Sequence, residues 1–212
     1  MRRKIAIVGN GDMGEGAAEA IDAADCVIRF NDCRSYGPGG SRTDVVAVCN
    51  TGLPAKTMLG SAKWRAHPAI VAAREIWSVR DPAKFVEMHP MLALSHPELD
   101  DFCDDYTDEF GAFCAAAAKT HVVIGRTVHD AIDHALLAFE PRRYVVPSSG
   151  MIVIGHVLGN FPDHDVVLAG FDHGGWEWHP FAAEKKLVDH YAAIGRISRL
   201  ASRQPELSRQ GT

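Results

Sequence analysis

The sequence predicts one α/β domain with a doubly wound, mostly parallel sheet and helices on both faces. Short apolar runs of strand length alternate with longer helical stretches, which is the pattern of parallel sheets. The chain has 212 residues, of which 47% are hydrophobic and 23% charged, a composition that suits one globular domain. We expect this domain to span residues 1–202 and the polar stretch 203–212 to form a flexible tail.

The first half of the chain supplies four of the expected strands. Residues 4–8 read KIAIV, a buried-strand pattern, and a glycine-rich segment and an alanine-rich helix follow as far as Ala23. The segment CVIRF at 26–30 is the second strand, and a loop rich in glycine and proline follows it. Residues 44–49 and 76–79 are the third and fourth expected strands.

The second half is expected to be mostly helical. Residues 81–119 are acidic, and Phe102, Tyr106, Phe110 and Phe113 recur there at helical spacing, which indicates a core-facing stripe. We expect strands at 122–124 and 166–169. Further helices are expected at 130–139, at 151–158 and from Pro180 onward.

Composition excludes several classes of function. The net charge is −5 and no basic stripe stands out, so nucleic-acid binding is not expected. No apolar stretch is long enough to span a membrane, and no signal-peptide core is seen. The five cysteines lack CxxC spacing, and we expect reduced thiols in a cytoplasmic protein.

A glycine-rich turn follows the first strand. Residues 9–14, GNGDMG, match the G-x-G-x-x-G fingerprint of dinucleotide-binding folds. That fingerprint needs an acidic residue where the second strand ends. Here the strand ends with Arg29-Phe30-Asn31, and Asp32 lies two residues beyond the position that the fingerprint requires. Arg29 leaves room for a 2′-phosphate, so an NAD(P)-dependent oxidoreductase is the alternative hypothesis. A plain tight turn would also explain the glycines.

Polar residues stand where a ligand of an open α/β sheet is expected. Asn10, Asn31 and Asn50 each follow a predicted strand, and ligands bind outside the carboxyl ends of such strands. Their amides offer both a donor and an acceptor. Ser148-Ser149-Gly150 precedes a helix, where a serine cap and a free helix start favour a nearby anion.

Three segments in order resemble the motifs of the sialyltransferase family (glycosyltransferase family 29). IVGNG, ID, VIRFN and RTD, within residues 5–44, look like the large motif. PSSGM at 147–151 with VVLAGFD at 166–172 is similar to the small motif, and WHPFAAEKKLVDH at 178–190 to the last one. The resemblance covers residues 5–50 and 147–190. Ile5 stands at the large-motif cysteine and no anchor is seen, which indicates a short, bacterial-type form.

The resemblance implies a Rossmann-like sialyltransferase fold and an inverting glycosyltransferase. It implies transfer of a sialic-acid-like or Kdo-like sugar from a CMP-activated donor to the hydroxyl of a carbohydrate or glycolipid acceptor, without metal or other cofactor. His179 would be the general base, supported by Glu184. The residues implied to bind the donor are Gly9, Asn10, Gly11, Asn31, Asn50, Ser148, Ser149, Gly150, His173 and Trp178.

His179 also has a local signature. It precedes Pro180, which favours the first position of a helix, so His179 should lie at the junction of loop and helix. The positive helix end favours its neutral form. A zinc site from His164, His173, Glu177 and His179 is not expected, because their spacing matches no ligand pattern. A non-catalytic nucleotide-binding module remains a second alternative.

Overall fold

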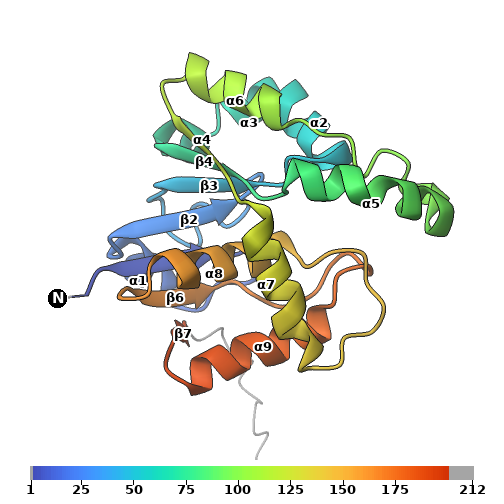
Figure 1. Cartoon of the computed structure of the whole chain (residues 1–212). Helices are drawn as coiled ribbons and strands as arrows, with labels where there is room; N and C mark the ends of the chain where they lie inside the picture. Colours follow the sequence, from blue (N-terminus) through green and yellow to red (C-terminus); the bar gives the residue numbers. More distant parts are fainter. Residues whose placement is uncertain (1, 201–212) are drawn as a thin grey trace, which may run out of the picture.

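The described part of the chain, residues 2–200 of a computed structural model, forms one parallel sheet of seven strands (Figure 1). The expected tail at 203–212 lies outside the described residues. The strand order is β5-β4-β3-β2-β1-β6-β7, and every neighbouring pair is parallel. The strands are β1 (Lys4–Val8), β2 (Cys26–Phe30), β3 (Val45–Val48), β4 (Glu75–Ser78), β5 (Thr120–Val123), β6 (Asp165–Ala169) and β7 (Ile197–Arg199).

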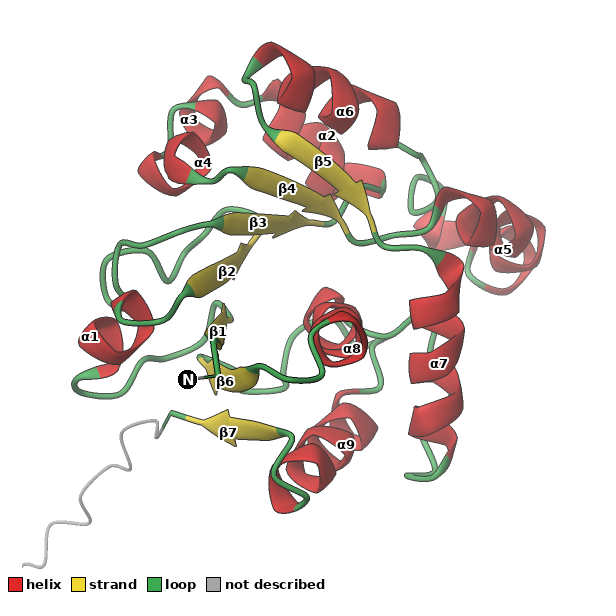
Figure 2. Ribbon diagram, turned by 60° about the vertical axis from the view of Figure 1, so that its left-hand side comes forward, coloured by secondary structure: helices red, strands yellow, loops and turns green. Residues whose placement is uncertain are grey.

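Helices cover both faces of this sheet, which confirms the predicted doubly wound class (Figure 2). One face packs on α7 (Arg126–Leu137), α8 (Ser149–Asn160) and α9 (Phe181–Ala193). The other face packs on α1 (Ala17–Asp22), α2 (Gly52–Gly60), α3 (Ala62–Arg65), α4 (Pro68–Ala72) and α6 (Thr107–Ala116). The remaining helices are α5 (Pro82–Ser95) and the 3₁₀ turn η1 (Pro97–Leu99).

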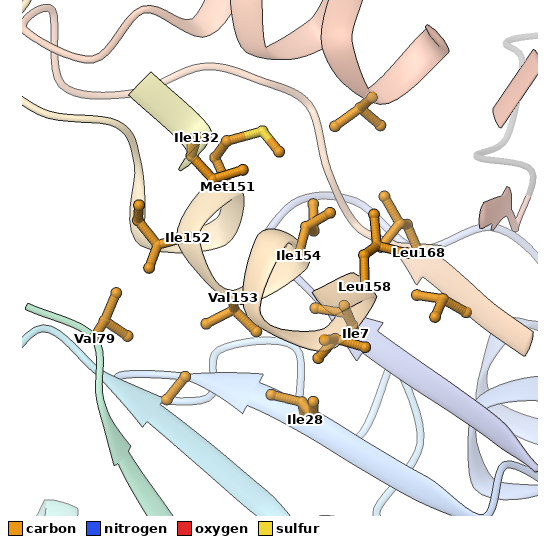
Figure 3. Close-up of a cluster of buried hydrophobic side chains, with 14 of the residues drawn as sticks. Ile7, Ile28, Val79, Ile132, Met151, Ile152, Val153, Ile154, Leu158 and Leu168 are labelled. Carbon is orange, nitrogen blue, oxygen red and sulfur yellow. The ribbon is translucent and has the colours of Figure 1, made fainter. Parts of the chain in front are cut away.

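The side chains of each strand alternate between these two layers. Ile5 and Ile7 of β1 enter the core beneath α8, whereas Ala6 and Val8 face α1. Figure 3 shows α8 in the middle of the larger cluster, with apolar side chains of the sheet gathered around it. Because both faces of the sheet are covered, the inner strands are largely apolar, and this is why their positions could be predicted from short apolar runs.

Two predictions for the middle of the chain needed correction. The acidic stretch 81–119 divides into α5, η1 and α6, so Phe102 and Tyr106 lie outside any long helix. Phe110 is buried as expected, and Phe102 instead stacks on Phe85 of α5 at a centroid distance of 5.5 Å. The helix α5 ends at Ser95, and Pro97, which cannot continue it, begins the 3₁₀ turn η1.

The order of the strands reverses at β1. From β1 the chain adds β2 to β5 on one side, then returns to place β6 and β7 on the other. Loops after neighbouring strands therefore diverge at the carboxyl end of β1, where open α/β sheets bind their ligands.

Candidate functional site

A cavity of about 630 Å³ lies at this reversal point. Its walls are the loops after β1, β2 and β6 together with the first turns of α8 and α9, so segments far apart in the sequence meet there. The size lies within the range of small-molecule sites. The cavity brings together ten of the twelve predicted site residues: Gly9, Asn10, Gly11, Asn31, Ser148, Ser149, Gly150, His173, His179 and Glu184.

The glycine turn does not have the geometry of a dinucleotide site. Gly9 and Gly11 donate their backbone N–H groups to the carbonyls of Ala169 and Gly170, at 2.8 and 3.0 Å, so these donors are already occupied. The nearest helix, α1, begins at Ala17 and has six residues, so no helix start adjoins the turn. The glycines are needed because a Cβ at Gly9 would lie 2.2 Å from the carbonyl oxygen of Gly170. Close packing of β1 against β6 therefore explains this motif.

Arg29 does not face a ligand either. It is fully buried, and its guanidinium donates to the carbonyls of Gly39, Gly40 and Arg42 and to the hydroxyls of Ser35 and Thr43. All of these acceptors belong to the loop between β2 and β3, so Arg29 holds that loop in place. The suggested contact with a 2′-phosphate of NADP is absent.

The first turn of α8 forms one wall of the cavity. The hydroxyl of Ser148 caps the helix by accepting from the N–H of Met151 at 3.1 Å. The N–H groups of Ser149 and Gly150 have no earlier carbonyl of the helix to bond. They remain donors for a ligand, as predicted for this segment, and the partial positive charge of the helix end favours an anion there.

His179 lies at the loop-to-helix junction, as its position before Pro180 predicts. Its Nδ1 is 2.8 Å from the carbonyl oxygen of Val146, and because a carbonyl only accepts, Nδ1 carries the proton. Burial, with the charge of Arg80 adding to it, lowers the pKa of His179 to about 4. The ring is therefore neutral at pH 7, and its Nε2 offers an acceptor to the cavity. Whether it acts as a base stays a prediction.

Glu184 is buried, with 1% of its surface exposed, and it contacts a different residue from the one expected. Its carboxylate accepts from the N–H of Ser148 at 2.6 Å and from the hydroxyl of Ser148 at 2.7 Å. No hydrogen bond between Glu184 and His179 is found among the described residues. Burial raises the pKa of Glu184, while the bonds from Ser148 and the charge of Arg80 oppose that rise.

Two asparagines line the opposite wall. Asn31 has a left-handed backbone, with φ of 50°, its Oδ1 accepts from the N–H of Cys49, and its carbonyl accepts from the indole of Trp64. The first bond holds the side-chain amide and the second holds the backbone of Asn31, which lines the cavity. The Oδ1 atom of Asn10 is buried and has no hydrogen-bond partner within residues 2–200, and an unsatisfied buried polar atom is costly unless a ligand or water completes it.

Two predicted residues lie elsewhere. Asn50 is fully buried, and its side chain bonds the backbone N–H and carbonyl of Arg80 and the hydroxyl of Thr107. Trp178 packs its ring on His96, with centroids 4.4 Å apart, rather than lining the cavity. Both follow the predicted local pattern, but the tertiary fold turns their side chains into the protein.

Several cavity residues were not among the predicted ones. Their aromatic rings and one arginine complete the walls: Phe30, Arg34, Phe171, Trp176 and Phe181. Trp176 stacks on Phe102 at 5.1 Å and meets His179 edge-on at 4.9 Å. The Gly-Gly pair before Trp176 was the available signal, because an aromatic ring after such a turn often closes a site.

His173 occupies the rim of the cavity with a left-handed backbone, φ 53°. Its Nε2 lies 3.4 Å from both terminal nitrogens of Arg199. Burial, and then the charge of Arg199, lowers the pKa of His173 to about 4, so this ring is neutral at pH 7. Residues 2–200 contain no group of three or more His, Cys, Asp or Glu side chains placed to hold a metal ion.

The fold and cavity define the class: a doubly wound α/β protein with a candidate ligand site where the strand order reverses. The chain is 58% identical over 200 residues to the urease operon 23 kDa accessory protein of Rhizobium meliloti (strain 1021), and the match covers 93% of each protein. The chain belongs to the family of that accessory protein. No protein-family model matches it.

Solved structures with a similar fold include sialyltransferases. A mammalian sialyltransferase superposes with a TM-score of 0.56 at 17% identity, covering 95% of this chain and 70% of the other. The sialyltransferase CstII from Campylobacter jejuni gives 0.55 at 12% identity, covering 97% and 82%. Likeness at these identities shows the fold alone.

The expected sialyltransferase family, CMP-sugar glycosyltransferase activity and glycan or glycolipid acceptors are therefore wrong, because the 58% identical relative is a urease accessory protein. The NAD(P)-dependent oxidoreductase is not supported either. Some of the motif residues that suggested sialyltransferases have a structural role in this chain. Asp22 accepts from the N–H groups of Ser41 and Arg42, and Gly40 packs against its carboxylate. Such residues specify a fold rather than a reaction.

No helix within residues 2–200 is long and apolar enough to cross a membrane.

Proposed function

We propose that the chain is a ligand-binding accessory protein that supports urease production, and that its cavity holds a phosphate-bearing ligand of mononucleotide size. The observation that supports this proposal most is the cavity itself. It lies where the strand order reverses, and it adjoins the first turn of α8, whose N–H groups are available to a ligand. The link to urease rests on the name of its relative, the urease operon 23 kDa accessory protein.

The chemistry of the walls supports this ligand class. The N–H groups of Ser149 and Gly150 suit a phosphate, and the exposed guanidinium of Arg34 stands at the rim. Asn10 and the neutral His179 offer acceptors for hydroxyl or amino groups. Phe171 and Trp176 supply flat apolar surface for a ring.

Calorimetry with inorganic phosphate and the four ribonucleoside 5′-monophosphates tests the ligand class. We expect at least one nucleotide to bind more tightly than phosphate. Asn10→Asp should weaken binding by about tenfold or more, because it places a negative charge beside the anion. Asn160→Asp, at the far end of α8, is the matched control and should bind as the unaltered protein does. No binding by any of these probes would contradict the proposal.

The link to urease needs a separate measurement. We expect cells that carry a urease operon but lack this chain to show lower urease activity at an equal amount of urease protein. The unaltered chain should restore activity and Asn10→Asp should restore less. Equal activity with and without the chain would contradict the accessory role.

We also propose that the protein works in the cytoplasm. All five cysteines, at positions 26, 33, 49, 103 and 114, are free thiols, which is usual in a reducing compartment. Cell fractionation tests this, with the protein expected beside cytoplasmic markers.

A further inference from the structure

One peptide group beside the cavity is bonded at both ends by buried charged side chains. The carbonyl of Pro147 accepts from Nη1 of Arg80 at 2.9 Å. The N–H of Ser148, which belongs to the same peptide group, donates to Oε1 of Glu184 at 2.6 Å. Arg80 is 2% exposed and Glu184 1%. A cation and an anion thus hold opposite ends of one peptide dipole immediately before α8.

This arrangement also explains how two charges tolerate burial. A buried charge is costly unless hydrogen bonds or an opposite charge compensate it. Within the described residues no carboxylate lies within 4.0 Å of Arg80, so the peptide group bridges Arg80 and Glu184 in place of a direct ion pair. Hydrogen bonds that run in one direction through such a chain strengthen one another.

Arg80 and Glu184 also contact side chains of the same turn. Oε2 of Glu184 accepts from the hydroxyl of Ser148, which caps α8, and Nη2 of Arg80 lies 3.5 Å from the hydroxyl of Ser149. On the other side, the Asn50 side chain bonds both the N–H and the carbonyl of Arg80. The pair is therefore anchored to the sheet edge and to α9, and it fixes the turn between them.

We propose that Arg80 and Glu184 act together as positioning residues, holding the 147–148 peptide so that the free N–H groups of Ser149 and Gly150 face the cavity. The consequence for ligand affinity rests on the proposed function, whereas the positioning itself does not. This positioning of the 147–148 peptide requires an ionised Glu184, because only the carboxylate accepts hydrogen bonds from both donors of Ser148 at once.

The titratable groups around Arg80 and Glu184 come from four segments of the chain. Arg80 follows β4, His179 precedes α9, Tyr144 lies in the loop before α8, and His129 on α7 approaches Arg80. Burial lowers the pKa of each histidine to about 4, and burial with the bond to Asp133 raises the pKa of Tyr144. Beyond Tyr144, Lys84 pairs with Asp133. Burial raises the pKa of the Glu184 carboxyl above its ordinary value, so its protonation is favoured over that of an ordinary glutamate as pH falls.

Protonation of Glu184 should therefore change two measurable quantities in opposite directions, because it raises the free energy of unfolding and lowers the affinity for the ligand. The pKa of Glu184 is higher in the folded than in the unfolded state, so its protonation adds to the free energy of unfolding as pH falls. The same protonation weakens the hold on Ser148. A purely structural role would give the first effect without loss of ligand affinity.

Nuclear magnetic resonance of the unliganded protein tests the positioning directly. We expect the Ser148 amide proton to shift with one pH transition that disappears in Glu184→Gln and persists in the control Glu177→Gln, an exposed residue of the neighbouring loop. A transition that survives in Glu184→Gln, or no transition in the unaltered protein, would overturn the proposal.

Calorimetry over the same pH range gives the second readout, with the tightest-binding ribonucleoside monophosphate as the probe. The affinity of the unaltered protein should fall about tenfold across the transition, and that of Glu184→Gln should be low and independent of pH. Arg80→Met should also bind weakly, and Arg80→Lys should recover part of the affinity; circular dichroism checks that each variant folds. A pH-independent affinity in the unaltered protein would overturn the proposed coupling. If the amide transition behaves as expected and no probe binds, the positioning stands and the proposed function fails.

Discussion

Arg29 shows how a single buried side chain can hold a loop in place through hydrogen bonds. Its guanidinium reaches three backbone carbonyls and two hydroxyls, all between residues 35 and 43. This loop has positive φ at Gly37 and Gly40 and joins the hydrophobic core through Cys33 and Tyr36, while the hydrogen bonds of Arg29 hold its other residues.

Replacing Arg29 by Met should lower the free energy of unfolding by about 3 kcal/mol, since it leaves several buried carbonyls without donors. Urea denaturation at pH 7 measures this. Arg34→Met is the control, because the Arg34 side chain is 70% exposed, and a change below about 0.5 kcal/mol is expected there. Equal losses in the two variants would contradict this account of Arg29.

At the scale of residues, the sequence predicted where a residue lies in the fold better than it predicted which way its side chain points. Asn10, Asn31 and His179 were expected in the site, because residues directly after parallel strands or before Pro180 reach one sheet edge. Asn50 satisfies the same local pattern and yet turns inward to Arg80. The choice depends on which acceptors the distant residues 80 and 107 place beside it, and local sequence does not hold that information.

At the scale of elements, the contact between the ends of β1 and β6 sets the floor of the cavity. The loops touch so closely that Gly9 and Gly170 leave no room for a side chain. Glycine at position 170 also adopts φ of 65°, which L side chains rarely adopt.

Gly9→Ala should separate these loops and lower the free energy of unfolding by about 2–3 kcal/mol. Thermal or urea denaturation measures it. Gly159→Ala in α8 is the matched control, since a Cβ there meets nothing within 4 Å and alanine should stabilise the helix by about 0.5–1 kcal/mol. A neutral result for Gly9→Ala would refute the close contact.

Six strands could be predicted because each contains a short apolar run, although β5 at the sheet edge is partly exposed. β7 was missed because it has three residues, of which only Ile197 is buried. The helices α2, α3 and α4 have nine, four and five residues, too few for a helical period to be visible in the sequence. Packing against β3 and β4, rather than local propensity, makes them helical.

At the scale of the whole molecule, three histidines from separate segments are held neutral. Burial is the main cause for His129, His173 and His179, and it lowers each pKa from 6.5 to about 4. In the unfolded chain they take up protons below about pH 6.5. The stability they contribute is present above that pH and is lost as pH falls toward 4. Glu184 acts in the opposite direction.

His129→Gln should therefore reduce the loss of stability in acid. His129 is 1% exposed, and its share of that loss between pH 7 and pH 5 is roughly 2 kcal/mol. Urea denaturation at both pH values measures the difference. The control His89→Gln changes an exposed residue of α5 and should lose as much stability as the unaltered protein. An identical acid loss in His129→Gln would contradict the prediction.

The position of β1 in the sheet also has a consequence for synthesis. β1 pairs with β2, which begins at Cys26, but its other edge stays unpaired until β6 is made, and β6 begins at Asp165. A ribosome needs on the order of ten seconds to make the intervening chain. Throughout that time the nascent protein carries an open strand edge and an incomplete cavity, so this chain is a natural client for chaperones until its last fifth has been translated.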